Sequence, residues 1–334
     1  MLVGITYDLR EDYLNDGFSE EETAEFDAEV TIDAIDSTLQ QLGYITERIG
    51  NHKALLHSLV SGKRWDLVFN ICEGMYGVAR EAQVPALLDA YRIPYVFSDP
   101  LVMALTLNKA LTKKLIRYHG IPTADFIVAE RTSDIDNLNL PFPLFAKPVA
   151  EGTGKGISSK SIIRSRLQLK AVVSSLLEQY EQPVLIETYL PGREFTVGIV
   201  GTGSEARVVG VMEIVVTSRA KEKIYSFHTK ENWHGVVEYP MAHGEAYEHC
   251  ADVALRAWQA LGCRDGGRVD LKMDANGVPN FIEVNPLAGI NPEHSDFPML
   301  ARKVGVSYID LIDMIMNSAV KRVNHSKACQ ISFA

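Results

Sequence analysis

Apolar runs alternate with amphipathic segments along the first hundred residues, and this alternation predicts alternating strands and helices. The strand-like runs are LVGITY, YITERI, WDLVFNI and IPYVF. The segments between them carry apolar residues at helical spacing: residues 20–42, ALLHSLV and PALLDAYR. Such a series favours a doubly wound parallel sheet.

The remaining residues mix helices and strands without an internal repeat. Helical spacing occurs at residues 100–120, 165–180, 245–261 and 307–320. Strand-like runs are ADFIVAE, PLFAKPV, PVLIETYL, EFTVGIVG, ARVVGVMEIVV, GRVDLKM and NFIEVN. The polar stretch from Ser218 to Pro240 interrupts this pattern, and we expect it to form a long surface loop.

The sequence GRVDLKMDANGVPNFIEVN predicts a β-hairpin, because Asn-Gly between two alternating runs favours a two-residue turn. With that turn, Asp270 would lie opposite Glu283, and Arg268 opposite Asn285. Side chains alternate along a strand, so these four would share one face. The other face would carry the core residues Val269, Leu271, Met273, Ile282 and Val284.

Two carboxylates that face each other across a strand pair repel, which is unfavourable unless a cation lies between them. The oxygens of Asp270 and Glu283, with the Asn285 carbonyl beside them, suit magnesium. The alternative is a solvated pair that points into water, with Arg268 only neutralising it. The register favours the metal site.

The loop EGTGKG at residues 151–156 is a candidate anion site, although it lacks the spacing of a P-loop or a dinucleotide fingerprint. Its glycines let backbone N–H groups approach an anion, and Thr153 and Lys155 can add donors. Lys147 lies in an apolar strand, where a lysine is costly without an anion. The alternatives are a plain flexible turn for the loop and a surface position for Lys109.

Other polar clusters are less informative. The strand end from Glu187 to Leu190 offers backbone groups for an adenine, yet by itself it is an ordinary strand end. The run from His294 to Asp296 does not make a nucleophilic triad, because adjacent side chains diverge. Asp8 and the acidic run at residues 20–29 are most simply a solvated helix face.

Composition restricts the class of protein. At about 150 residues per domain, 334 residues suggest two or three domains. A net charge of −10 lacks the basic surface of a general nucleic-acid binder. The four scattered cysteines are typical of free thiols in a reducing compartment. Neither a signal peptide nor an apolar run of ~18 residues is visible, so we expect a soluble cytoplasmic protein.

The order of these motifs resembles the ATP-grasp superfamily and, more narrowly, the D-alanine–D-alanine ligase family, from about residue 2 to residue 320. The most specific part is GRVDLKMDANGVPNFIEVNPLAGINPEHSDFP, which resembles the family's R-x-D and E-x-N motifs and its substrate loop. AKPVAEGTGKG resembles the family's K-P-x-x-E-G-S-S-x-G loop. IPYVFSDPLVMALTLNKALTK resembles its I-P-Y-T-G-S…K segment.

The resemblance implies an α/β (α+β) ATP-grasp fold with three parts. Residues 1–100 would form a Rossmann-like domain with a parallel sheet. Residues 101–188 and 189–322 would form the two parts that clasp ATP between antiparallel sheets, the second carrying the metal and substrate site.

The resemblance also implies roles by position. The phosphates would be bound by Lys109 and Lys147 and covered by a loop that includes Glu151, Gly152, Thr153, Gly154 and Gly156. Adenine would be held by Glu187, Thr188, Tyr189 and Leu190, and ribose by Glu194. Two magnesium ions, which manganese could replace, would be held by Asp270, Glu283 and Asn285. The implied catalytic residues are Arg268, Lys230 and Ser295.

The implied reaction joins a carboxylate to an amine. The carboxylate would attack the γ-phosphate of ATP to give an acyl phosphate, which the amine would then attack to form an amide. Magnesium and the lysines would stabilise the transferring group, and Arg268 the tetrahedral oxyanion. The partners would be small amino-acid substrates and a second copy of the chain, with no nucleic acid or membrane.

Three departures concern the amino-acid pockets. The family's G-G-x-S-x-E-R-E segment is absent, so Glu25 and Glu29 are candidates to anchor the first substrate's amine. Glu231 replaces a tyrosine in the mobile loop and would point into solvent or meet a cation. Asp296 replaces a leucine, and a buried carboxylate needs a partner. Candidate partners are Lys230, Arg302 and a substrate ammonium.

Three functions therefore compete. The first is a D-alanine–D-alanine ligase for peptidoglycan synthesis, and the second is a related ligase that joins other amino acids in secondary metabolism. The third is a non-catalytic ATP-binding protein. The intact set of Arg268, Asp270, Glu283 and Asn285 argues against the third function, because a binding module needs neither an oxyanion cation nor a second carboxylate.

Overall fold

The first part of the chain builds a three-stranded parallel sheet in the order β2-β1-β3, which confirms the predicted parallel sheet. The computed structural model describes residues 1–217 and 235–331. The strands are β1 (Leu2–Tyr7), β2 (Ile45–Gly50) and β3 (Leu67–Ile71). The helices of this part are α1 (Arg10–Asn15), α2 (Glu29–Gln41), α3 (His52–Val60) and α4 (Gln83–Ala90).

Two segments of this part differ from the prediction. The run IPYVF pairs with β3 only at Tyr95, because Pro94 lacks an N–H and Phe97 turns to a φ of 74°. Helix α2 begins at Glu29, so residues 20–28 precede it in turns and are not a solvated helix face. Phe26 in this segment is buried in the protein, and so is Asp8.

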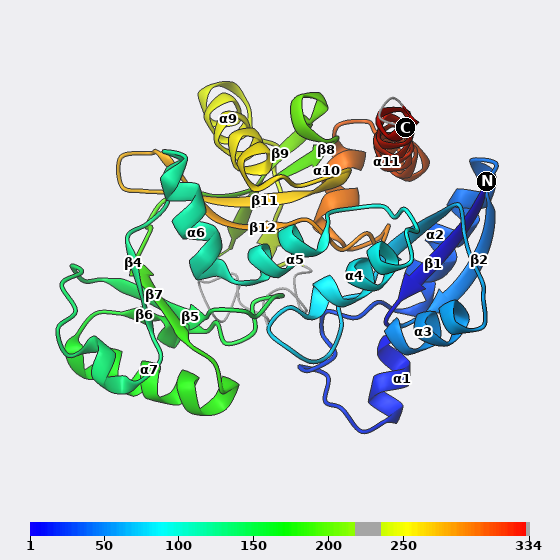
Figure 1. The fold of residues 1–334 in the computed structure, drawn as a ribbon. Helices are drawn as coiled ribbons and strands as arrows, with labels where there is room; N and C mark the ends of the chain where they lie inside the picture. Colours follow the sequence, from blue (N-terminus) through cyan, green and yellow to red (C-terminus); the bar gives the residue numbers. More distant parts are fainter. Residues whose placement is uncertain (218–234, 332–334) are drawn as a thin grey trace.

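The middle of the chain carries a four-stranded antiparallel sheet, in the order β4-β7-β5-β6. Its strands are β4 (Phe126–Ala129), β5 (Leu144–Pro148), β6 (Ile162–Ile163) and β7 (Val184–Thr188), and helix α7 (Arg166–Tyr180) packs on one face (Figure 1). The helix predicted at 100–120 is two helices, α5 (Pro100–Leu107) and α6 (Lys109–Tyr118). Asn108 adopts an extended backbone between them and caps α6, accepting a hydrogen bond from the Leu111 N–H.

The last part carries a five-stranded antiparallel sheet, in the order β10-β9-β8-β11-β12. Its strands are β8 (Glu194–Val200), β9 (Arg207–Val216), β10 (Val237–Glu238), β11 (Gly266–Met273) and β12 (Pro279–Asn285). Helix α9 (Gly244–Leu261) lies on the opposite side of this sheet from the four-stranded sheet (Figure 1). Helices α10 (Asp296–Lys303) and α11 (Tyr308–Ile331) join it to the first sheet, where Phe297 and Ile312 share one apolar cluster with Ile5.

Four short 3-10 helices complete the described fold: η1 (Arg80–Ala82), η2 (Thr132–Ile135), η3 (Ser159–Ser161) and η4 (Gly203–Glu205). Among the described helices, none is both long and apolar enough to cross a membrane. The fold is therefore α/β, with one parallel and two antiparallel sheets.

The hairpin of β11 and β12 places the predicted pairs in register, although its turn differs from the prediction. Asp274 closes a longer turn by accepting hydrogen bonds from the Asn276 and Val278 N–H groups at 2.8 and 2.9 Å. This turn shifts the register by one residue, and a bulge at Ile282 restores it. Ile282 consequently lines the site and is not a core residue, while Phe281 is buried.

Candidate active site

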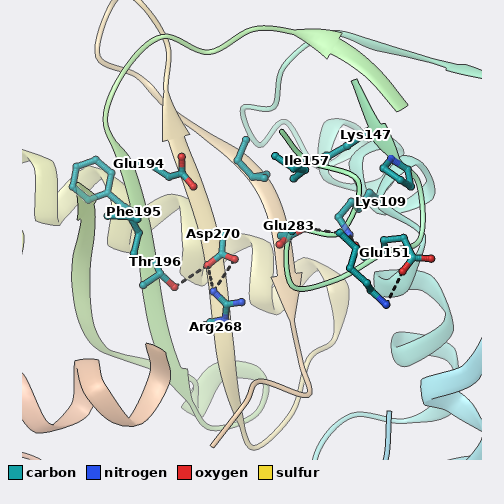
Figure 2. A pocket seen from close by; sticks show the side chains of 15 residues that line it. Lys109, Lys147, Glu151, Ile157, Glu194, Phe195, Thr196, Arg268, Asp270 and Glu283 are labelled. Atoms are coloured by element: carbon teal, nitrogen blue, oxygen red, sulfur yellow. Dashed lines mark hydrogen bonds and ion pairs between the residues drawn. The ribbon is translucent and has the colours of Figure 1, made fainter. Parts of the chain in front are cut away.

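A cavity lies between the four-stranded and five-stranded sheets, and together with a larger cavity beside it, it collects most of the site residues predicted from the sequence. Lys147 reaches it from β5 and Glu194 from β8, while the hairpin contributes Arg268, Asp270 and Glu283 (Figure 2). Of the predicted residues, those lining this cavity or the larger one beside it are Lys109, Lys147, Glu151, Gly152, Thr153, Gly154, Glu194, Arg268, Asp270, Glu283, Asn285 and Ser295.

The two facing carboxylates of the hairpin each pair with a cation of the protein. Asp270 accepts a hydrogen bond from the Thr196 hydroxyl at 2.8 Å and lies 3.0 Å from the Arg268 guanidinium. Glu283 lies 3.2 Å from the Lys109 ammonium. The repulsion expected between the carboxylates is thus offset by Arg268 and Lys109, which flank them.

The donor set of this site fits magnesium. Two carboxylates and the Asn285 amide are hard oxygen ligands, and the Asn285 amide lies 3.3 Å from Asp270. Among residues 1–217 and 235–325, no group of three or more His, Cys, Asp or Glu side chains is arranged to hold a metal. A magnesium ion here would therefore need further oxygens from phosphate or water, as this ion normally does.

Glu187 is buried between two lysines and does not line the cavity. Its carboxylate lies 2.7 Å from Lys113 and 3.4 Å from Lys147. Burial by itself would raise the pKa of Glu187, but the two ammonium groups outweigh burial and lower it. Lys113 was not predicted from the sequence, because its i,i+4 position after Lys109 on α6 is also typical of an exposed helix face.

Glu194 pairs with another residue that the sequence analysis missed. The Lys272 ammonium donates to its carboxylate at 2.6 Å. Burial would lower the pKa of Lys272, but the nearby Glu194 carboxylate outweighs it and raises the pKa. The R-x-D pattern of β11 contains a signal for Lys272, since every second residue of that strand faces the site.

The glycine-rich loop is tied to the first part of the chain through Glu25. Lys155 lies 2.8 Å from Glu151 and 3.3 Å from Glu25, and Arg80 donates to Glu25 at 2.9 Å. Burial would raise the pKa of Glu25, but Arg80 and Lys155 outweigh it and lower the pKa. A Cβ at Gly152 would lie 2.2 Å from Glu25 Oε1, so a larger residue there would force the Glu25 carboxylate to shift from its place beside Arg80 and Lys155.

Asp296 finds its partner in Arg268, whose guanidinium lies 3.1 Å from the Asp296 carboxylate. The expected partner Arg302 instead donates to the Pro292 carbonyl at 3.4 Å. Helix α10, which the sequence analysis did not predict, begins at Asp296 and aims this side chain at β11. The preceding Ser295 hydroxyl accepts a hydrogen bond from the Asn291 N–H at 3.0 Å.

Some predicted residues lie elsewhere. Glu29 is exposed and pairs with Arg48 at 2.8 Å, so Glu25 and not Glu29 faces the larger cavity. The predicted residues that line neither cavity are Gly156, Glu187, Thr188, Tyr189 and Leu190. The backbone N–H groups of Thr188 and Tyr189 already donate to carbonyls within the four-stranded part. Lys230 and Glu231 lie outside the described residues.

Comparisons with known proteins agree with this geometry. The model of the family "D-ala D-ala ligase C-terminus" matches residues 115–317. A D-alanine–D-alanine ligase of Bordetella petrii is 30% identical over 297 residues, which cover 84% of this chain and 88% of that protein.

Two solved structures share the fold along almost the whole chain. The D-alanine–D-alanine ligase of Bacillus anthracis in complex with ATP has a TM-score of 0.73 at 22% identity, covering 98% of this chain and 99% of that one. The VanG D-Ala:D-Ser ligase of Enterococcus faecalis has a TM-score of 0.72 at 20% identity, with coverage of 95% and 99%. The sheets, the hairpin and the family match agree: the chain belongs to the D-alanine–D-alanine ligase family of ATP-grasp ligases.

Proposed function

We propose that the protein joins two small amino-acid substrates through an acyl phosphate, as a D-alanine–D-alanine ligase would. The observation that carries this proposal is the facing pair Asp270 and Glu283, flanked by Arg268 and Lys109 in the cavity between the two sheets. A protein that only binds ATP needs neither the second facing carboxylate nor Arg268, the cation that would stabilise an oxyanion.

The residues that would handle ATP are cationic or glycine-rich. Lys109 and Lys147 would bind phosphate oxygens as point charges, and the loop at 151–156 would cover them. Asp270, Glu283 and Asn285 would hold magnesium, which neutralises charge on the phosphates when bound. Lys272 holds Glu194 in place at the cavity wall, where Glu194 would bind ribose.

The proposed reaction has two steps, transfer of a phosphoryl group and formation of an amide. A substrate carboxylate oxygen attacks the γ-phosphorus of ATP; the bond from phosphorus to the bridging oxygen breaks, and ADP leaves. The amine nitrogen of the second substrate, deprotonated, then attacks the acyl carbon. Arg268 would stabilise the oxyanion, phosphate leaves and an amide remains.

A second candidate is a ligase of the same chemistry that joins amino acids other than two D-alanines. Asp296 favours this second candidate. Its carboxylate replaces a neutral residue of the family pattern, lines the larger cavity and forms an ion pair with Arg268. A role in peptidoglycan synthesis belongs to the first candidate and a role in secondary metabolism to the second.

One experiment tests both candidates. ADP release is measured with magnesium and ATP over single D- and L-amino acids and their pairs, and each product is identified by mass. A dipeptide product supports the proposed chemistry, and its composition decides between the candidates. If no amino acid pair supports ADP release, the proposal is overturned.

Family membership also supports a homodimer in the cytoplasm. Equilibrium sedimentation of the purified chain would show a mass twice that of the monomer. A monomer at all concentrations would contradict the dimer without affecting the proposed chemistry.

A further inference from the structure

The larger cavity continues from the metal and phosphate residues toward the first part of the chain. It shares Lys109, Arg268 and Glu283 with the smaller cavity beside it. Its far wall is acidic: Glu25 and Asp27 precede α2, Glu73 follows β3, and Glu81 lies in η1. A substrate that reaches the metal site from this side therefore passes or contacts four carboxyl groups.

Two of these carboxyl groups lack a partner in the described part of the chain. Glu25 is held by Arg80 and Lys155, but neither Glu73 nor Glu81 makes a hydrogen bond or an ion pair there. Both carboxyl groups are desolvated by surrounding protein, while the residues keep partial exposure, as side chains that line a cavity do. Burial raises the pKa of Glu73, and repulsion from the nearby Glu81 raises it further.

One cation of the cavity lining, Arg10, donates to the Glu20 carbonyl at 3.3 Å and makes no ion pair with Glu73 or Glu81, and the other cations nearby are held by other groups. The charge of Arg80 partly offsets the raised pKa of Glu73 and Glu81, but Arg80 is held by the Glu25 carboxylate at 2.9 Å and the Ala150 carbonyl at 3.1 Å. Lys109 lies against Glu283, and Arg268 lies between Asp270 and Asp296. Burying Glu73 and Glu81 as charged groups without a counterion is costly, so the site is suited to a ligand that brings one.

We propose that one substrate of this ligase is a diamino acid or diamine, whose additional ammonium group binds between Glu73 and Glu81. This inference rests on the proposed ligase function and deepens it by naming the substrate class. An amino acid with a neutral side chain, such as alanine, leaves both carboxyl groups without a counterion. A diamino acid supplies the counterion in addition to the α-ammonium.

The test compares matched substrates in the full chain. Lysine and ornithine are compared with norleucine and norvaline, in both D and L forms, as ADP release with magnesium and ATP. A charge-assisted contact in a desolvated site predicts kcat/KM at least about tenfold higher for the diamino acids. Binding of lysine or ornithine alone, measured by calorimetry without ATP, should show the same preference independently of catalysis.

Two variants test whether Glu73 and Glu81 cause the preference for diamino acids. Glu73→Gln and Glu81→Gln should each lower the preference for the diamino acids about tenfold, mainly through KM. Glu11→Gln, at an exposed position on α1 outside the cavity, should leave the preference unchanged.

Ligation of neutral amino acids with no preference for diamino acids, or an unchanged preference in both glutamine variants, would overturn this inference and leave the ligase function standing. No ADP release with any amino acid would instead overturn the ligase function, and the calorimetric preference would then judge the cation site alone.

Discussion

The carboxylate of Asp296 lies 3.1 Å from the guanidinium of Arg268, which also lies 3.0 Å from Asp270. Arg268 is therefore held from both sides by acidic groups. Asp296 stands in the first turn of α10, where the helix dipole favours a negative charge. Asp296, which stands where the resemblance to the family predicts a leucine, thus fixes the cation at which the oxyanion would form, and it reduces the positive charge that would be offered to a substrate carboxylate.

Asp296→Leu should lower the free energy of unfolding by about 1–3 kcal/mol, because it removes one partner of a largely buried pair. Asp296→Asn keeps an oxygen that can accept the hydrogen bond, so it should lose about half as much. Urea denaturation of both variants measures the difference. Glu248→Gln, at an exposed position on α9, is the control.

ADP release in the same variants separates positioning from folding. If Asp296 positions Arg268, kcat should fall more in Asp296→Leu than in Asp296→Asn, with KM for ATP unchanged. Equal kcat in wild type and both variants would show that the pair has no part in the reaction.

Glu283→Gln should abolish ADP release, because an amide replaces one of the two facing carboxylates that would hold magnesium. The expected loss is at least about a hundredfold, since loss of outer-shell partners alone can cost that much. The fold should remain cooperative in thermal unfolding, because Glu283 lies at the cavity wall. Calorimetry should show that magnesium no longer strengthens ATP binding.

Near-normal turnover of Glu283→Gln at ordinary magnesium concentrations would contradict the metal assignment. Glu238→Gln, on the exposed face of β10, provides a matched control in the same sheet. It should keep both turnover and the magnesium effect.

The hairpin shows what the sequence can and cannot predict. Alternation placed Asp270 opposite Glu283 correctly, since strand side chains have a fixed period. The predicted two-residue turn was wrong, because Asp274 closes a longer loop. Only the bulge at Ile282 restores the predicted pairs. A local pattern does not reveal such compensation, which depends on how β12 pairs with its neighbour.

The partners of the site residues were harder to predict than the residues themselves. Lys113, Arg80 and Asp296 contact groups between 28 and 74 positions away, and no local spacing links them. Glu25 lies in an acidic run that looks solvated, yet the fold turns this one carboxylate inward against Gly152. Charge patterns identified candidate groups, and only the tertiary structure shows which charges neutralise each other.

Lys147 and Lys113 both pair with Glu187, but only Lys147 lines the cavity. Lys147→Ala should therefore weaken ATP binding by about tenfold or more, because it removes a charge-assisted contact. Lys113→Met should instead lower the free energy of unfolding by about 3–5 kcal/mol, because Glu187 loses the nearer of its two buried cations.

Calorimetry of ATP binding and urea denaturation, run on both lysine variants, distinguish the two roles. Unchanged ATP affinity in Lys147→Ala would remove Lys147 from the phosphate site. A fully stable Lys113→Met would show that Lys147 alone neutralises Glu187.

Asp27 predicts a pH dependence of stability. Burial raises the pKa of its carboxyl group from 3.8 to about 7, although the Thr31 hydroxyl favours the charged form. Between these two values the folded protein holds a proton that the unfolded chain has released, so stability falls as pH rises from about 4 to about 7 and then levels off.

Asp27→Asn removes this dependence. Relative to wild type, it should gain roughly 2–3 kcal/mol at pH 8 and little at pH 4, allowing for the partial exposure of the residue. Urea denaturation at both pH values measures the gain, and an equal difference at pH 4 and pH 8 would contradict the raised pKa of Asp27.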